Sequence, residues 1–213
     1  MFGITGNVVF KEGQVINISH IYSLNFRIAR QVLDCSSKML PFILNKEENT
    51  VYNTLIVSPP GRGKTTLLRD CIRKISNGII EYDFKGINVG VVDERGEIAA
   101  MYKGIPQNDL GERTDILDNI SKEIGIKMLI RSMNPKVVVA DEIGTKQDVE
   151  AIYEAVTSGV KGIFTAHGNG LKDITANPIL QPLLKAGIVE RVIFIEKNRG
   201  LTKLYAKEKG EDV

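Results

Sequence analysis

The chain has 213 residues, of which 43% are hydrophobic and 25% are charged, and its formal net charge is +2. This length supports one sizeable domain, and the balance of apolar and charged residues excludes a wholly disordered chain. The small basic excess gives no electrostatic argument for a nucleic-acid partner.

The two cysteines, Cys35 and Cys71, lie far apart and belong to no CxxC motif. This pattern indicates a cytosolic chain with reduced thiols, and Cys71 falls on the apolar face of an expected helix, which favours a packed thiol. No stretch reaches the ~20 apolar residues that cross a bilayer, and the first residues lack the basic and apolar regions of a signal peptide. We therefore expect any work at a membrane to depend on other proteins.

The first twenty residues predict a small hairpin. Residues 8–10 and 15–18 are mostly apolar, and they flank the polar, glycine-containing run at residues 11–14. A lone hairpin is marginally stable in water, so this one is expected to lean on other structure. Apolar residues then recur with helical spacing from Leu24 to Leu44, which predicts a helix there.

The rest of the chain alternates short apolar runs with amphipathic segments. The expected strands are residues 54–57, 88–92, 137–140 and 162–166, the expected helices are 64–75, 124–133, 149–156 and 177–186, and the expected terminal antiparallel strands are 191–196 and 201–206. Continuous apolar strands separated by helices predict an α/β fold, a mostly parallel sheet with helices on both faces. Ser58, Asp93, Asp141 and His167 follow four of the strands, at the edge where such sheets bind ligands.

A P-loop is predicted between the first of these strands and its helix. The run is Ser58, Pro59, Pro60, Gly61, Arg62, Gly63, Lys64, Thr65 and Thr66, which matches G-x-x-x-x-G-K-[ST] except that a serine replaces the first glycine. Small residues let backbone N–H groups surround a phosphate, and the helix N-terminus adds positive charge. Lys64 supplies a cation for the β- and γ-phosphates, and the Thr65 hydroxyl reaches Mg²⁺. ATP and Mg²⁺ are therefore the expected ligands; the alternative is a glycine-rich turn with a chance lysine.

Two acids follow the apolar run at residues 137–140. In the Walker B pattern, Asp141 would orient a water on Mg²⁺, and Glu142 would polarise the attacking water. Strand ends often carry solvated acids, but a preceding P-loop strengthens the functional interpretation. Thr65 and Asp141 are thus the expected metal ligands.

Further candidates follow two other strands and one loop. Asp93 or Glu94 would be a second catalytic carboxylate, or else a partner of Arg95 at the sheet edge. His167 would sense the γ-phosphate or report the nucleotide state to a neighbouring subunit, or else be a satisfied polar group. Arg113, in the polar loop at residues 107–115, would face phosphate or another subunit, or form a surface ion pair.

Five segments together resemble the stage III sporulation protein AA family, the ATPases associated with the channel between mother cell and forespore in endospore-forming bacteria. They are residues 91–99, 106–109, 113–118, 128–135 and 141–144, within a resemblance that runs from about Gly3 to Tyr205. This family is similar to the type II and type IV secretion ATPases, RecA-like hexamers with a Walker A, an acidic box, a Walker B and a histidine box. By this resemblance, the Walker A contains Lys64 and Thr65, and the acidic box contains Asp93 and Glu94. The Walker B contains Asp141 and Glu142, and the histidine box contains His167.

The resemblance also implies an organisation. Residues 1–20 would be the last hairpin of an N-terminal domain that family members carry in longer form, so this copy would be shortened. Residues 21–206 would form the RecA-like ATPase domain, and residues 207–213 a disordered tail. The site would lie between protomers of a homo-hexamer, with an arginine supplied by a neighbour or by the N-terminal domain. The partners would be integral membrane proteins of the stage III sporulation complex, at the mother-cell face of the forespore membrane.

Three functions are weighed against each other. The first is an ATP-hydrolysing motor for a secretion or channel apparatus, and the second is a non-hydrolysing nucleotide-binding scaffold in that complex. The third is a nucleic-acid translocase, which the near-neutral charge disfavours because each neutralised phosphate needs a Lys or Arg. A small-molecule kinase is disfavoured by the lack of an arginine-rich lid-like segment. Tyr22, Arg27 and Ile28 are candidates for contacting adenine.

Overall fold

The computed structural model describes residues 2–26, 31–195 and 201–206. The chain divides into two compact units, Met1–Arg30 and Gln31–Val213. Two sequence-based expectations fall outside the described residues: the adenine candidates Arg27 and Ile28, and the tail at residues 207–213.

The first unit is an antiparallel hairpin of β1 (Phe2–Lys11) and β2 (Gln14–Phe26). Glu12 and Gly13 connect the strands with φ values of 52° and 77°, the left-handed conformation at both central residues of a tight hairpin turn. The hairpin is longer than expected from the sequence. Its second strand extends through residues 24–26, where Leu24 pairs with Ile4.

The helix expected from Leu24 to Leu44 is therefore wrong over most of its described length. Residues 24–26 belong to β2, residues 33–39 form turns, and only α1 (Leu40–Ile43) is helical. The carboxylate of Asp70 explains the turns, because it accepts hydrogen bonds from the backbone N–H groups of Asp34 and Ser36. A buried side chain from a distant helix thus replaces the hydrogen bonds that a local helix would make.

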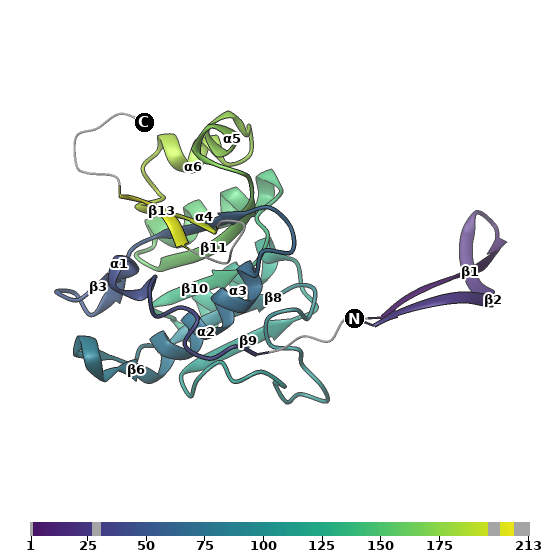
Figure 1. Ribbon diagram of the computed structural model, residues 1–213, viewed down its shortest axis with the longest axis horizontal. Helices are drawn as coiled ribbons and strands as arrows, with labels where there is room; N and C mark the ends of the chain where they lie inside the picture. The colour runs from purple at the N-terminus through teal and green to yellow at the C-terminus, as the bar shows by residue number, and fades with distance from the viewer. Residues whose placement is uncertain (1, 27–30, 196–200, 207–213) are drawn as a thin grey trace. The chain divides into compact units, whose positions relative to one another are not determined.

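The second unit is built on a sheet of seven strands in the order β13-β12-β5-β11-β10-β8-β9. Six of them run parallel, and β13 pairs antiparallel with β12 at one edge. The strands are β5 (Thr54–Ser58), β8 (Val89–Asp93), β9 (Thr114–Asp118), β10 (Val137–Ala140), β11 (Lys161–His167), β12 (Arg191–Ile195) and β13 (Leu201–Ala206). This arrangement (Figure 1) confirms the predicted parallel α/β fold with terminal antiparallel strands.

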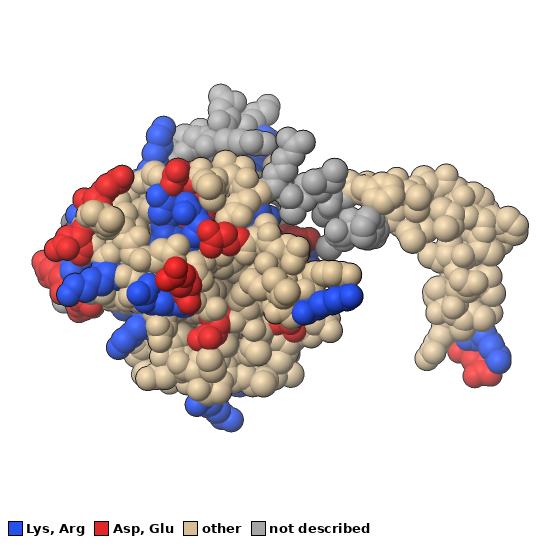
Figure 2. Space-filling view, turned by 90° about the horizontal axis from the view of Figure 1, so that it is seen from below, with Lys and Arg blue, Asp and Glu red and all other residues tan. Residues whose placement is uncertain are grey.

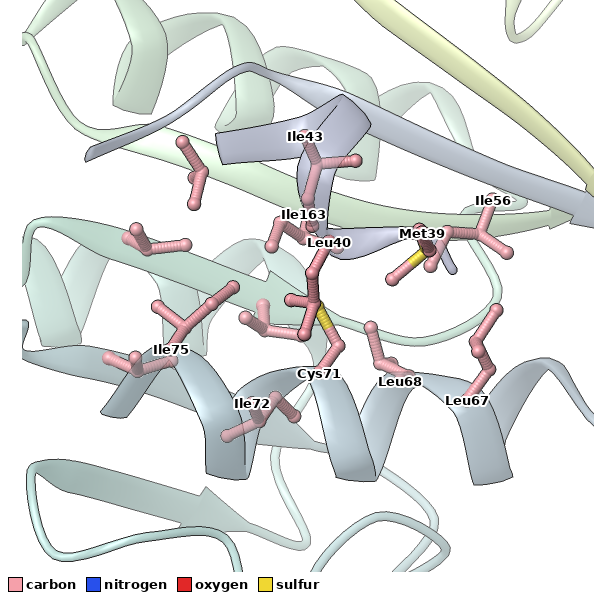
Figure 3. Packing of buried hydrophobic residues seen from close by; sticks show 14 of the residues in the cluster. Met39, Leu40, Ile43, Ile56, Leu67, Leu68, Cys71, Ile72, Ile75 and Ile163 are labelled. Atoms are coloured by element: carbon pink, nitrogen blue, oxygen red, sulfur yellow. The ribbon is translucent and has the colours of Figure 1, made fainter. Parts of the chain in front are cut away.

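Helices cover both faces of the sheet, because its central strands carry apolar side chains on both sides. On one face, α1 and α2 (Lys64–Asn77) pack on residues such as Ile56 and Ile163, and Figure 3 shows this cluster with Cys71 inside it. The fully buried Cys71 confirms the packed thiol expected from the sequence. The other face is covered by α3 (Lys122–Met133), α4 (Lys146–Thr157), α5 (Leu171–Ala176) and α6 (Gln181–Lys185).

Two details of the second unit differ from the expectations. Of the helix expected from 177 to 186, only α6 is helical. Asn177 instead closes a separate turn, in which its side chain accepts hydrogen bonds from the N–H groups of Ile179 and Leu180. The strand β9 falls partly in the segment expected to be a loop. Short elements complete the unit: β3 (Leu44–Asn45), β4 (Thr50–Val51), β6 (Gly78–Ile79), η1 (Ile80–Tyr82) and β7 (Phe84–Lys85).

Within the ranges given above, no helix combines the length and the apolar character that a membrane span requires.

Candidate nucleotide-binding site

The expected P-loop lies where β5 ends at Ser58 and α2 begins at Lys64. Gly61 and Gly63 have φ values of 73° and 94°, and a Cβ at either position would meet nothing within 4 Å. Glycine is therefore required here by backbone conformation and not by lack of space. Gly63 is the N-cap of α2, and no side chain caps the helix, so its first N–H groups face the loop without a side-chain acceptor.

Ser58, which replaces the first glycine of the motif, is the last residue of β5 and is buried. Its backbone is part of the parallel ladder with β11, where it pairs with His167, and its hydroxyl donates to the carbonyl of Pro59. An extended residue has no need of glycine. The substitution thus leaves the turn at Gly61 and Gly63 intact.

The Lys64 side chain is buried against the end of β11. Its Nζ atom donates to the Ser58 carbonyl oxygen at 3.2 Å and contacts His167 Nδ1 at 3.1 Å. Burial lowers the pKa of Lys64, and the nearby carboxylates of Asp141 and Glu142 oppose this shift. The ammonium group of Lys64 is thus held by a carbonyl oxygen and a ring nitrogen. A negatively charged phosphate oxygen would be a stronger acceptor than either.

The two expected metal ligands lie in contact. The Thr65 hydroxyl donates to Asp141 Oδ2 at 2.7 Å, and the other carboxylate oxygen contacts the Thr165 hydroxyl. Hydroxyl and carboxylate oxygens are ligands that Mg²⁺ accepts, with water and phosphate oxygens completing the shell. The described ranges contain no group of three His, Cys, Asp or Glu residues arranged to hold a metal by themselves.

Glu142 lies two residues after the end of β10, with its backbone in the left-handed region at φ 51°. Its N–H donates to the hydroxyl of Thr165 at 2.8 Å, and this contact fixes the strained conformation. Its carboxylate contacts Arg95 Nη1 at 2.5 Å through Oε2 and His167 Nε2 at 3.1 Å through Oε1. The structure thus brings Lys64, Glu142 and His167 into one chain of contacts.

Asp93 and Glu94 occupy different environments. Asp93 is 2% exposed, and its two carboxylate oxygens accept hydrogen bonds from the backbone N–H groups of Glu97, Ile98 and Ala99. Glu94 forms an ion pair with Lys122 at the start of α3. Neither acid pairs with Arg95 as the alternative interpretation expected; Arg95 pairs with Glu142. Asp93 therefore shapes the loop that follows β8.

A small cavity joins these acids at the carboxyl edge of the sheet. Its charged lining residues are Asp93, Glu94, Arg95, Glu97, Lys122, Asp141 and Glu142. Sequence reasoning did not single out Glu97 or Lys122 for the site, and it considered Arg95 only as a partner of Asp93 or Glu94. Lys122 was missed because the helix was expected from residue 124, whereas α3 begins at Lys122, where a cation opposes the helix dipole and gains from an anionic partner.

Another candidate, Arg113, lies away from the loop. Arg113 donates from Nη1 to the Ser76 carbonyl oxygen in the last turn of α2, at the opposite end of a 14-residue helix. Such a helix is about 21 Å long, so the phosphate-facing role expected for Arg113 is wrong for the P-loop of its own chain. Tyr22 lies in the hairpin unit and is 74% exposed.

Comparison with known sequences identifies one family. The sequence profile described as "Sporulation stage III, protein AA" matches residues 1–213. "Stage III sporulation protein AA" of Bacillus subtilis (strain 168) is 39% identical over 209 residues, which are 97% of this chain and 66% of that protein. "Uncharacterized protein ycf45" of Cyanidium caldarium is 29% identical over 188 residues, 86% of this chain and 51% of that protein. The chain thus spans about two thirds or less of the length of these relatives.

Solved structures of two DotB ATPases and of a pilus retraction motor share the fold. The ATPase DotB of Yersinia pseudotuberculosis superposes with a TM-score of 0.55 at 15% identity, over 91% of this chain and 51% of that chain. The pilus retraction motor PilT with bound ADP gives 0.54 at 17% identity, over 92% and 57%. DotB of Legionella pneumophila gives 0.52 at 14% identity, over 74% and 43%. These similarities confirm the predicted RecA-like P-loop fold.

Proposed function

Because this chain belongs to the stage III sporulation protein AA family, we propose that it is a Mg²⁺-dependent ATPase of the secretion-ATPase type. The observation that carries the proposal is the contact of the P-loop Thr65 with Asp141, beside Glu142 and Lys64. A P-loop, a Walker B aspartate and a water-polarising glutamate are the parts that phosphoryl transfer to water requires.

Triphosphate binding would rest on the loop and on the start of α2. The backbone N–H groups from Gly61 to Thr65 would surround the phosphates, and Lys64 would exchange its contact with His167 for a phosphate oxygen. Thr65 and Asp141 are the residues that would hold Mg²⁺, which supplies positive charge against the phosphates when bound. Pro59, Pro60, Arg62 and Thr66 complete the loop.

Hydrolysis would rest on Glu142. Its carboxylate is partly exposed, borders the cavity beside Asp141 and would accept a proton from the attacking water. His167 contacts both Glu142 and Lys64 and is therefore suited to link phosphate binding with the acid. Glu94 lines the same cavity, and Asp93 supports it through the loop.

Turnover and binding measured on three variants test this assignment. Glu142→Gln is expected to bind ATP with Mg²⁺ as the wild type does and to lose hydrolysis, whereas Lys64→Ala is expected to lose binding. Glu150→Gln, the same change on the exposed side of α4, is the matched control and should hydrolyse normally. Wild-type turnover in Glu142→Gln would overturn the role given to Glu142.

A non-hydrolysing scaffold is the second candidate, and one observation favours it. Both oxygens of the Glu142 carboxylate already have a partner, Arg95 or His167, and these contacts compete with an attacking water. Single-turnover measurements with excess enzyme separate the two functions. Conversion of bound ATP supports the ATPase, and stable binding without conversion supports the scaffold.

The assembly belongs to the same proposal. We infer a homo-oligomer, six copies by analogy with the secretion ATPases, held at the mother-cell face of the forespore membrane by integral membrane proteins of the stage III sporulation complex. There it would energise or assemble the channel between mother cell and forespore. Sedimentation with and without ATP and Mg²⁺ tests the oligomer, and a species that stays monomeric with saturating nucleotide would contradict it.

A further inference from the structure

Glu142 is contacted by residues that follow or end the two strands on either side of β10. Its strand β10 lies between β11 and β8 in the strand order. His167, at the end of β11, contacts Oε1 of Glu142, and Arg95, just after β8, contacts Oε2. Each carboxylate oxygen therefore has its own partner, and the two partners approach from opposite neighbouring strands.

The backbone of Glu142 is also restrained, by hydrogen bonds of its own N–H group and of the next residue. Its N–H is shared between the Thr165 hydroxyl at 2.8 Å and Asp141 Oδ1 at 3.0 Å. The N–H of Ile143 donates to the Thr165 carbonyl oxygen at 2.8 Å. With the backbone fixed by β11, the direction of the carboxylate is set by its side-chain torsions, and these are fixed by Arg95 and His167.

The position of Arg95 is fixed by the loop that follows β8. The buried Asp93 accepts three backbone hydrogen bonds from residues 97–99, which fixes the turn on which Arg95 lies. The Arg95 side chain is 59% exposed, and an exposed ion pair adds little to stability. The consequence of this contact is therefore the orientation of Glu142 and not the stability of the fold.

We propose that Arg95 is a positioning residue for the hydrolysis assigned to this site, acting by orienting the carboxylate of Glu142. The inference rests on the proposed ATPase function. Arg95 contacts the Glu142 carboxylate oxygen opposite the one that His167 contacts, and the acid borders the cavity beside Asp141. A guanidinium suits this role because its fork of donors holds a carboxylate in one direction, which an ammonium does less well.

Steady-state and single-turnover kinetics test the proposal. Arg95→Gln is expected to lower kcat about 10- to 100-fold, the range that a misplaced catalytic group produces, with ATP affinity within about twofold of the wild type. Arg95→Lys should recover part of the loss because it restores the charge without the fork. Arg131→Gln, the same change on an exposed residue at the far end of α3, is the matched control and should leave kcat unchanged.

Two kinetic results would overturn the proposal. One is an unchanged kcat in Arg95→Gln, which would leave the contact a surface ion pair. The other is a large loss of ATP affinity at unchanged kcat, which would place Arg95 on the nucleotide and not on Glu142. If the wild-type chain hydrolyses no ATP, the proposed ATPase function fails, and the role of Arg95 is then tested without turnover.

That test uses the ring of His167, one of only two histidines in the chain. Lys64 Nζ can only donate, so His167 Nδ1 accepts and Nε2–H donates to Glu142. Arg95→Gln should therefore shift the ¹⁵N signal of His167 Nε2 and leave that of His20 in place, since releasing one oxygen of Glu142 alters the other contact. The shift should vanish in a Glu142→Gln background. An unmoved signal, or a shift that persists without Glu142, would overturn the proposal.

Discussion

Thr165 shows how one buried hydroxyl supports two functional acids. Its side chain contacts Asp141 Oδ1 and accepts the N–H of Glu142, and the residue is completely buried. Since the hydroxyl donates one hydrogen bond and accepts another, its loss removes a donor from Asp141 Oδ1 and leaves the Glu142 N–H with only its weaker contact to that same oxygen. The residue therefore sets the geometry of the two acids.

Thr165→Val is accordingly expected to cost about 2 kcal/mol of unfolding free energy and to reduce ATP turnover, because both acids lose their support. Thr165→Ser keeps the hydroxyl and should retain more of both. Chemical denaturation and turnover assays on the two variants make the comparison. A valine variant as stable and as active as the serine variant would show that the hydroxyl is dispensable.

The two cysteines are predicted to be unreactive at neutral pH. Burial raises the pKa of Cys35 to about 11 and raises the pKa of Cys71 further still. Because both pKa values lie far above 7, both thiols stay protonated at neutral pH. The thiolate is the reactive form, so neither cysteine is expected to react readily. Iodoacetamide should therefore label the native protein far more slowly than the unfolded chain, and equal rates in the two states would contradict this view of the core.

At the scale of elements, Asp70 replaces the expected helix with turns. Burial alone would raise the pKa of this carboxyl, but hydrogen bonds from Ser36, Arg73 and Asp34 more than offset that effect and lower its pKa overall. A carboxyl with a lower pKa in the folded state stabilises the fold above its unfolded pKa, and this stabilisation is lost as the pH falls through the folded value.

Asp70→Asn should therefore destabilise the chain by about 3 kcal/mol at pH 7, since it removes a hydrogen-bonded buried charge and leaves Arg73 behind. The difference from the wild type should begin to shrink below pH ~4, the unfolded pKa, and be smallest below the lowered folded-state pKa, where the folded wild-type carboxyl also loses its charge. Asp83→Asn, on an exposed residue, is the control and should be neutral. A pH-independent difference would show that shape and not charge holds the turns.

A second prediction concerns the contact of α3 with the sheet. A Cβ at Gly125 would lie 2.6 Å from a methyl group of Val92, so only glycine lets the helix approach β8 this closely. Gly125→Ala is expected to cost about 1–3 kcal/mol by overpacking, despite the better helix propensity of alanine. Ser132→Ala on the exposed face of α3 should change stability little, and an alanine at 125 that stabilises the protein would contradict the packing described here.

These elements also show what the sequence could predict. The run at residues 137–140 was predicted with its correct bounds because β10 is buried on both faces and reads as continuously apolar. The edge strand β9 was missed because its sequence, TDILD, contains only two apolar residues. The spacing of apolar residues between 24 and 44 is typical of a helix. Nothing in that segment indicated that the Asp70 carboxylate would accept hydrogen bonds from its backbone N–H groups.

At the scale of the whole molecule, the site follows from topology. Ser58, Asp93, Asp141 and His167 come from four strands that are far apart in sequence, and the parallel order brings their carboxyl ends to one edge. This convergence was predictable from the expected parallel direction of the strands. The pairing of Arg95 with Glu142 and of Glu94 with Lys122 was not, because it depends on how the loop after β8 is folded.

The hairpin unit has an unusual surface. Some cross-strand pairs are apolar on both strands, as in Ile4 with Leu24 and Phe10 with Val15, and each of these four residues is at least 46% exposed. Figure 2 shows charge of both signs over one face of the larger unit and almost none on the hairpin, whose described residues carry only Lys11 and Glu12 among Lys, Arg, Asp and Glu.

Removal of residues 1–30 should therefore leave the second unit folded, since the two units have separate contact networks. Its unfolding free energy is expected to change by less than about 0.5 kcal/mol, while binding of an apolar fluorescent dye falls because exposed apolar area is lost. Thermal denaturation and dye titration of both chains provide the measurement. Loss of cooperative unfolding would show that the hairpin is part of the second unit.

The central claim is that backbone N–H groups at the start of α2, together with Lys64, hold a triphosphate. Calorimetric titration with ATP and Mg²⁺ tests it most directly, on the wild type and on Lys64→Ala, with folding of both checked by circular dichroism. We predict saturable heat at one site per chain for the wild type and none for the variant. A well-folded wild-type protein that gives no heat and no thermal shift with ATP and Mg²⁺ would contradict the account.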